Sequence, residues 1–199
     1  MLLASSNAGK LREYRDLAAG SSIEIGLVPR FSDFPAFEES APTFAENAAG
    51  KALHYSKLTK EIIFADDSGL VVPALGGEPG VHSARYAGEN ATDSDRVKKL
   101  LRAMEGEEGN GRQARFVCVI AIALQGHVLA AVSDSVEGVI SREPSGQNGF
   151  GYDPVFLIPD LSRSYAEVSR DEKNRRSHRG KAFRRLLSHF ADEDLLRRT

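Results

Sequence analysis

The stretch FADDSGLVVPALGGEPGVHSARYAG, residues 64–88, determines how the rest of the chain is interpreted. The apolar run at residues 62–65 predicts the end of a buried strand, and Asp66 and Asp67 follow it directly. Open α/β sheets bind ligands at strand ends, and neighbouring strand residues point to opposite faces. We therefore expect one carboxylate to face a ligand and the other to brace the loop. The glycines at residues 76–80 predict a loop with unusual backbone angles.

The composition of the 199-residue chain is typical of a globular protein. We expect one domain over residues 1–199 with two lobes, the central strand-rich lobe at roughly residues 110–150. A net charge of −2 gives no global reason to bind nucleic acid or an anionic membrane. The single cysteine, Cys118, excludes an internal disulfide framework and is typical of a reducing cytosol. The sequence has no long apolar segment and no signal-peptide pattern at its start.

Hydrophobic spacing and capping residues predict the secondary structure. Helices are expected at residues 10–19, 43–58, 92–104 and 177–190, with a capping box at Thr43 and Glu46. Strands are expected at residues 1–4, 23–28, 62–65, 116–124, 128–133 and 136–140. Helices and strands alternate at the start, and strands cluster in the middle. This order predicts an α/β fold with a mixed sheet.

Residues 5–10, SSNAGK, form a candidate anion site. A strand, a tight turn and a helix start would offer free backbone N–H groups, the positive end of the helix dipole and Lys10. The segment is not a Walker A motif, because it has no early glycine and Leu11 follows the lysine. The alternative is an ordinary strand-to-helix turn capped by Asn7 or Ser6.

The two aspartates and a nearby lysine form a second candidate site. Asp66 and Asp67 could bind Mg²⁺ or act as a general base toward water; a role in capping or turn formation is the alternative. Lys51, beside the acidic pair at residues 38–39, would suit a site that holds both a cation and phosphates. Its alternative is a solvated lysine on a helix.

Two later segments carry aromatic and basic side chains. In FGYDP, residues 150–154, aromatic rings could present a flat face to a base, and Asp153 could accept a hydrogen bond from a sugar or base. The alternative is a turn with core aromatics, which we favour for Tyr152. Residues 173–181 hold five cations in nine residues, which indicates either contact with a polyanion or a solvated helix face.

Five segments occur in a characteristic order: SSNAGK, TFAENAAGKA, FADDSGLVVPALGGEPGVHSARYAG, FGYDPVF and SYAEVSRDEKNRRSHRGKA. In this order they resemble the inosine/xanthosine triphosphate pyrophosphatase family, which removes non-standard purine nucleotides from the nucleotide pool. The resemblance extends from Leu2 to about Phe190. The first motif of the family usually reads Thr-Gly-Asn, where this chain has serine at positions 5 and 6.

The resemblance implies an elongated mixed β-sheet with flanking helices, forming two lobes around a central cleft, in a cytoplasmic homodimer. It implies Mg²⁺-dependent hydrolysis of ITP, dITP or XTP to the monophosphate and pyrophosphate. Asp67 would be the catalytic carboxylate and, with Glu39, would bind Mg²⁺. The same motif positions imply these substrate-binding residues: Ser5, Ser6, Asn7, Ala8, Gly9, Lys10, Lys51, Ser68, Phe150, Gly151, Tyr152, Asp153, Lys173, His178 and Arg179.

The mechanism expected from these roles is attack of a water, deprotonated by Asp67, on the α-phosphorus. Arg179 or a backbone N–H would donate to the 6-oxo group of hypoxanthine or xanthine and be left unpaired by adenine.

Two rival interpretations remain open. A pyrophosphatase for modified pyrimidine nucleotides would share the acidic site but bind a smaller base. A non-enzymatic module that binds nucleic acid through residues 173–181 would show salt-dependent binding to DNA or RNA. The near-neutral net charge and the two aspartates argue against the second interpretation.

Overall fold

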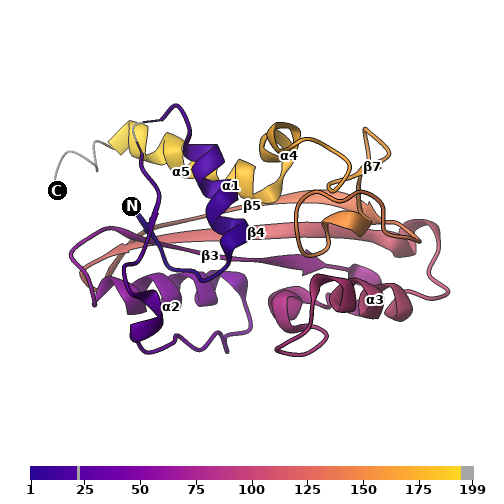
Figure 1. Cartoon of the computed structure of the whole chain (residues 1–199), viewed down its shortest axis with the longest axis horizontal. Helices are drawn as coiled ribbons and strands as arrows, with labels where there is room; N and C mark the ends of the chain where they lie inside the picture. Colours follow the sequence, from indigo (N-terminus) through magenta and orange to yellow (C-terminus); the bar gives the residue numbers. More distant parts are fainter. Residues whose placement is uncertain (22, 194–199) are drawn as a thin grey trace. The chain divides into compact units, whose positions relative to one another are not determined.

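The computed structural model describes residues 1–21 and 23–193 and confirms the predicted mixed α/β fold (Figure 1). Among these residues, one sheet has the strand order β2-β1-β3-β4-β5-β6-β7. The strands are β1 Leu2–Leu3, β2 Gly26–Leu27, β3 Ile63–Val71, β4 Gln113–Leu124, β5 His127–Ile140, β6 Phe156–Ile158 and β7 Arg163–Ser164. The helices are α1 Ala8–Ala18, α2 Phe44–Ser56, α3 Asp93–Ala103, α4 Arg170–Arg176 and α5 His178–Glu193. β1 pairs in parallel with β2 and β3, whereas β6 pairs antiparallel with β5 and β7.

Side-chain caps explain where the first four helices begin. Asn7, Thr43, Thr92 and Ser169 each accept a hydrogen bond from a backbone N–H in the first turn of α1, α2, α3 and α4, respectively. Each cap satisfies a donor that has no partner within its helix. The predicted starts of the second and third helices are therefore confirmed.

The chain divides into two compact units. The first comprises residues 1–67, residues 118–134 and the chain from Arg179 onward; the second comprises residues 68–117 and 135–178. A single domain with two lobes around a cleft stays a prediction.

Side chains alternate along the strands of the first unit, and each set meets a different helix layer. Figure 1 shows α1 and α5 on one side of these strands and α2 on the other. The cluster under α1 and α5 comprises Leu3, Tyr14, Ala18, Ile25, Phe64, Cys118, Ile120, Ile122, Ala182, Phe183, Leu186 and Phe190. The cluster over α2 comprises Ala4, Val28, Ala48, Ala52, Tyr55, Ile63, Ala65, Val119, Ala121 and Ala123. Because strand side chains repeat every two residues, even and odd positions of β3 face different helices.

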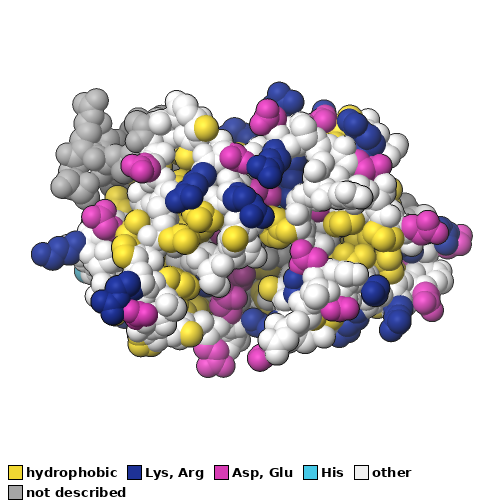
Figure 2. Space-filling view, viewed as in Figure 1, with side chains coloured by type: hydrophobic (Ala, Val, Ile, Leu, Met, Phe, Trp, Pro, Cys, Tyr) yellow, Lys and Arg dark blue, Asp and Glu magenta, His cyan; other side chains and the backbone are white. Residues whose placement is uncertain are grey.

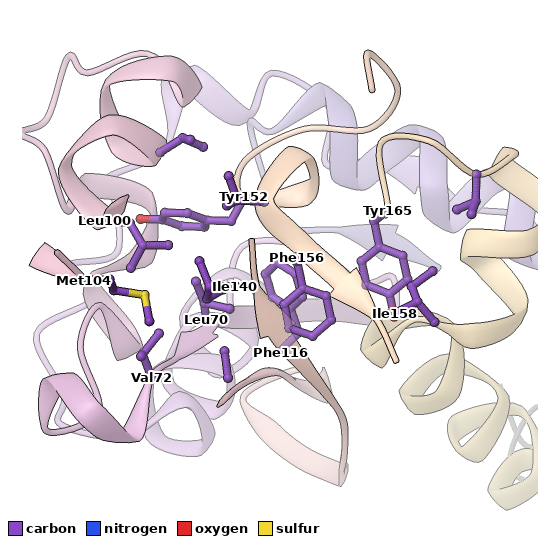
Figure 3. Packing of buried hydrophobic residues seen from close by; sticks show 14 residues of the cluster. Leu70, Val72, Leu100, Met104, Phe116, Ile140, Tyr152, Phe156, Ile158 and Tyr165 are labelled. Atoms are coloured by element: carbon purple, nitrogen blue, oxygen red, sulfur yellow. The ribbon is translucent and has the colours of Figure 1, made fainter. Parts of the chain in front are cut away.

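The core of the second unit is rich in aromatic rings (Figure 3). The rings of Phe116 and Phe156 lie 4.5 Å apart, and Tyr165 stacks on Phe156 with the ring centroids 5.3 Å apart. Burial of each such side chain contributes about 1.5–3 kcal/mol. Beside this core, the buried Arg112 donates to the carbonyl oxygens of Ile140 and Ser141, each at 2.7 Å.

Three sequence-based predictions about strands are wrong in detail. β3 does not end before Asp66 and Asp67 but passes through both of them to Val71. The strands expected at residues 128–133 and 136–140 form the single strand β5, because no turn residue interrupts them. The strand expected at residues 23–28 is reduced to Gly26–Leu27. Among the described residues, no helix is long and apolar enough to span a membrane.

Candidate functional site

The two adjacent aspartates of β3 point to opposite faces of the sheet. Asp66 shares the face of Phe64, under α1 and α5, and Asp67 shares the face of Ile63 and Ala65, over α2. Both residues are buried, with 1% and 6% of their surfaces exposed. The two carboxylates therefore have different surroundings, and both lie within the strand rather than at its end. That one of them faces a ligand stays a prediction, and the expectation that the other braces the loop is wrong, because Asp66 binds side chains of α1 and α5.

Side chains from α1 and α5 donate hydrogen bonds to both carboxylate oxygens of Asp66. Its Oδ2 accepts from the Tyr14 hydroxyl and from Arg179 Nε, each at 2.8 Å, and its Oδ1 accepts from Lys10 Nζ at 3.2 Å. Lys10 Nζ also donates to the backbone carbonyl of Asp66 at 3.0 Å. Each donor favours the ionised carboxylate, so Asp66 is a buried anion that joins α1, β3 and α5.

Arg179 is buried between two carboxylates. Its Nε donates to Asp66 and its NH1 to Glu13, and the whole side chain is 3% exposed. Although burial lowers the pKa of Arg179, these two carboxylates raise it well above its usual value. Burial, reinforced by the charge of Asp66, also raises the pKa of Tyr14, which keeps its hydroxyl a neutral donor.

Asp67 has the opposite character. Within the part of the chain that the structure describes, its Oδ2 is buried and has no hydrogen-bond partner. Burial raises its pKa from 3.8 to about 6; Glu39 adds to the rise, whereas Lys10 and Lys51 oppose it. Lys51 Nζ forms an ion pair with Glu39 Oε1. A buried carboxylate with a raised pKa, surrounded by cations, is typical of a functional site.

The surroundings of Asp67 fit a hard divalent cation. Its unpartnered Oδ2 and the carboxylate of Glu39 are the oxygen ligands that Mg²⁺ prefers. In residues 1–21 and 23–193, no three His, Cys, Asp or Glu side chains form a cluster that could hold a metal. Mg²⁺ commonly needs only one or two protein carboxylates, because water and substrate phosphates complete its coordination.

The strand-to-helix turn at residues 5–10 has its backbone organised for an anion. Asn7 Oδ1 accepts from the backbone N–H of Lys10 at 3.1 Å, and the Ser5 hydroxyl accepts from that of Asn7 at 3.1 Å. Ser6 and Ala8 are exposed at the start of α1. Ser6 is not among the residues with positive φ, so serine takes the position of the usual glycine without backbone strain.

In the second unit, a separate group forms around Asp153. Its Oδ2 accepts from Lys173 Nζ at 2.5 Å and from the backbone N–H of Phe150 at 2.8 Å. The Lys173 ammonium also lies 4.9 Å from the centre of the Phe150 ring. Gly149, at φ +76°, approaches so closely that a Cβ there would lie 2.0 Å from Asp153 Oδ2. These contacts bring together three residues predicted to bind substrate.

Other predicted residues take more varied positions. Tyr152 is in the core, as favoured, and its hydroxyl donates to the Ser83 carbonyl at 2.9 Å. The ring of His178 is buried and stacks on Phe116, with the centroids 4.6 Å apart. Ser68 follows Asp67 in β3 and is half-buried. Gly151 has a positive φ of 64°, and its backbone N–H donates to Asp93 at 2.7 Å.

The basic segment at residues 173–181 is not one solvated face. Lys173, His178 and Arg179 are buried, whereas Arg175 and Lys181 are exposed. On the face shown in Figure 2, lysine and arginine side chains are interspersed with aspartate and glutamate. The alternative of a wholly solvated helix face is therefore wrong, because three of the side chains bind carboxylates or aromatic rings.

Sequence reasoning missed Glu13 and Tyr14 as polar members of the site. Neither residue belongs to one of the five motifs, and hydrophobic spacing places Tyr14 only on the apolar face of its helix. Glu13 lies three residues after Lys10 and Tyr14 lies four residues after it, a spacing that places both on the same helix face as Lys10. This spacing could have indicated a shared polar partner, but it could not have identified Asp66.

We predict that Asp67→Asn stabilises the metal-free protein at pH 7.5. The pKa of Asp67 is higher in the folded state, so its ionised form opposes folding above pH 6, by about 1–3 kcal/mol at about 1.4 kcal/mol per pKa unit. The stability gain should shrink as the pH falls from 6 towards 4, because wild-type Asp67 then becomes protonated. Urea denaturation in EDTA at several pH values measures both effects.

The matched control is Asp160→Asn, because the side chain of Asp160 is 82% exposed. It should change the free energy of unfolding by less than about 0.5 kcal/mol at each pH. A destabilised Asp67→Asn variant at pH 7.5 would contradict the assignment of Asp67 as a poorly solvated carboxylate.

We predict that Arg179→Met lowers the free energy of unfolding by about 3–5 kcal/mol, because it removes the buried guanidinium that binds both Asp66 and Glu13, a loss that the Lys10–Asp66 pair offsets only in part. Arg185→Met is the control on the same helix. Its side chain is 62% exposed and its NH2 lies 3.6 Å from Asp134 Oδ2, so the cost should be about 0–1 kcal/mol. Equal costs in the two variants, measured by urea denaturation, would rule out a structural role for the buried network.

Comparison with known proteins supports the resemblance inferred from the motifs. Residues 1–189 match the model of the Ham1 family. The dITP/XTP pyrophosphatase of Gloeobacter violaceus is 50% identical over 188 residues, covering 94% of this chain and 92% of that protein. The dITP/XTP pyrophosphatase of Geobacillus kaustophilus is 47% identical over 186 residues, covering 94% and 91%.

Solved structures agree with these relatives. A HAM1 protein from Coxiella burnetii has a TM-score of 0.85 and 44% identity, and the match covers 96% of this chain and 100% of that one. The nucleoside-triphosphatase, or dITP/XTP pyrophosphatase, of Mycobacterium abscessus has a TM-score of 0.71 and 40% identity, with 94% and 97% covered. The sequence match over residues 1–189 and these structural matches lead to one conclusion: this chain belongs to the Ham1 family.

Proposed function

We propose that this protein hydrolyses non-standard purine nucleoside triphosphates, namely ITP, dITP and XTP, to the monophosphate and pyrophosphate. The observation that carries the chemistry is the buried Asp67, whose Oδ2 has no partner among the described residues and whose pKa is raised to about 6. The substrate class is supported by the relatives named dITP/XTP pyrophosphatase.

The proposed role of Asp67 is that of general base. It would take a proton from a water molecule, the water oxygen would attack the α-phosphorus, and the bond from that phosphorus to the bridging oxygen would break, so that pyrophosphate leaves. A raised pKa suits this role, because a base near neutrality is strong enough to accept the proton and is still ionised at pH 7.

We propose that Asp67 and Glu39 hold Mg²⁺, for which their oxygen atoms are suitable ligands. A bound Mg²⁺ would supply charge stabilisation at the phosphate oxygens. Lys10 and Lys51 would add positive charge beside the triphosphate, and the backbone N–H groups at residues 5–9 would bind phosphate oxygens at the start of α1. Preorganised charge of this kind is the main requirement for hydrolysis of a highly anionic substrate.

For the nucleoside, we propose that residues 150–153, Lys173 and His178 bind the base and sugar, and that Ser68 contacts the substrate. The ring of Phe150 and the Asp153 carboxylate are the groups suited to stacking and hydrogen bonding. We assign Arg179 a positioning role instead of base recognition, because its Nε and NH1 donate to Asp66 and Glu13. A cytoplasmic location, a homodimeric state and the lack of nucleic-acid and membrane partners stay predictions.

We predict that wild-type protein with Mg²⁺ releases pyrophosphate from ITP, dITP and XTP faster than from ATP, GTP or pyrimidine triphosphates. Asp67→Asn should lower kcat by about 10²–10⁴-fold, because the base that accepts the proton of the water is lost. A coupled pyrophosphate assay across this nucleotide panel measures both. The exposed variant Asp160→Asn is the control and should retain wild-type turnover.

Each rival interpretation gives a different outcome. Preferred turnover of modified pyrimidine triphosphates would replace the proposed substrate class. Salt-sensitive binding of DNA or RNA without pyrophosphate release would support the nucleic-acid module instead. Wild-type turnover by Asp67→Asn would remove the proposed role of Asp67.

A further inference from the structure

In the first unit, the cations proposed to bind phosphate already have anionic partners in the protein. Lys10 pairs with Asp66. Lys51, in α2, pairs with Glu39, in the loop before that helix. The side chains of Lys51 and Glu39 are 12% and 25% exposed, respectively. This pair is therefore partly removed from water, and its two charges attract each other more strongly than they would at the surface.

The Lys51–Glu39 pair joins two residues with opposite tasks in the proposed reaction. Glu39 is a proposed ligand of Mg²⁺, and Lys51 is a proposed ligand of phosphate. Lys51 therefore lies beside Glu39 where Mg²⁺ would bind, and Glu39 lies beside Lys51 where a phosphate oxygen would bind. Asp67 differs from Glu39 in this respect, because its Oδ2 has no partner to displace among the described residues.

The pair opposes either component of the substrate complex when that component arrives alone. A metal ion that binds Glu39 must displace the Lys51 ammonium and then lies near a cation that has lost its partner. A triphosphate that binds Lys51 takes the lysine charge away from the Glu39 carboxylate, which then lies beside a second carboxylate, Asp67, and beside the anionic substrate. The loss of an ion pair between partly buried charges is costly, so each single exchange is unfavourable.

A metal–triphosphate complex removes both costs together, because Glu39 then binds the metal and Lys51 binds a phosphate oxygen. We infer that the Lys51–Glu39 ion pair couples metal binding to triphosphate binding, so that the site accepts the metal–triphosphate complex and discriminates against either component alone. This inference rests on the proposed function, because it uses the proposed roles of Glu39 and Lys51. By linkage, each component must raise the affinity for the other by the same factor.

The test measures binding by titration calorimetry with two probes: Mg²⁺ alone, and an ITP analogue with a non-hydrolysable α,β-imido bridge. Lys51→Met retains most of the apolar stem and removes the ammonium that pairs with Glu39. It should tighten the binding of Mg²⁺ to nucleotide-free protein by about tenfold, within the usual range of coupling between sites. The control Lys60→Met removes the same charge from an exposed position and should leave Mg²⁺ affinity unchanged.

The reciprocal arm measures the analogue in EDTA. Glu39→Gln and Asp67→Asn each remove one carboxylate, but only the first also releases a lysine. Glu39→Gln should therefore bind the metal-free analogue about tenfold more tightly than Asp67→Asn does. A role of Glu39 as a metal ligand and nothing more would give equal affinities in the two variants.

Two results would overturn the inference without affecting the proposed function: unchanged Mg²⁺ affinity in Lys51→Met, or equal metal-free affinities in Glu39→Gln and Asp67→Asn. If wild-type protein with Mg²⁺ does not bind the analogue at all, the proposed function fails and the inference fails with it.

Discussion

The ion pair between Arg179 and Asp66 is the interaction on which the first unit depends. It connects positions 113 residues apart, and both side chains are almost fully buried. Because Lys10 and Tyr14 bind the same carboxylate, one side chain attaches both α1 and α5 to the middle of β3. A buried pair of charges is stable only when further hydrogen bonds compensate its desolvation, and the donors Lys10 and Tyr14 supply such bonds to Asp66.

The neighbouring Asp67 lies one position further along β3, so its side chain points to the opposite face of the sheet and has different neighbours. The face over α2 brings Lys51 near, but Lys51 pairs with Glu39, and Asp67 keeps an oxygen without a partner among the described residues. Two identical residues, adjacent in sequence, thus become a structural anion and a poorly solvated carboxylate with a raised pKa. A local arrangement that is unfavourable for folding is expected where a protein keeps a group available for chemistry.

Local sequence signals were sufficient for α1, α2, α3 and α5 but not for the short helix α4, which the sequence analysis did not predict. Asn7, Thr43 and Thr92 begin helices because their side-chain oxygens reach N–H groups only three residues away. The glycines at residues 76, 77 and 80 have positive φ, as the loop requires, and the turn at residues 125–126 joins β4 to β5. The order of the five segments was specific enough to indicate the family, and the role of Asp67 that it implies stays a prediction.

Contacts between residues far apart in the sequence determine the features that local signals could not predict, namely the length of β3 and the burial of the basic segment. Consecutive aspartates usually end a strand, yet β3 continues, because Arg179 and the residues of α1 compensate the charge of Asp66 inside the fold. The sequence of the basic segment is compatible with a solvated helix face, because the partners of its cations lie far away in the sequence. Arg179 binds carboxylates of the first unit, and Lys173 binds Asp153 in the second unit. Pairing of cations with carboxylates within each unit limits the charge that either must bury when no ligand is bound. Ligand recognition in such a protein is then an exchange of ionic partners, and its selectivity depends on whether the ligand can satisfy both members of each pair that it separates.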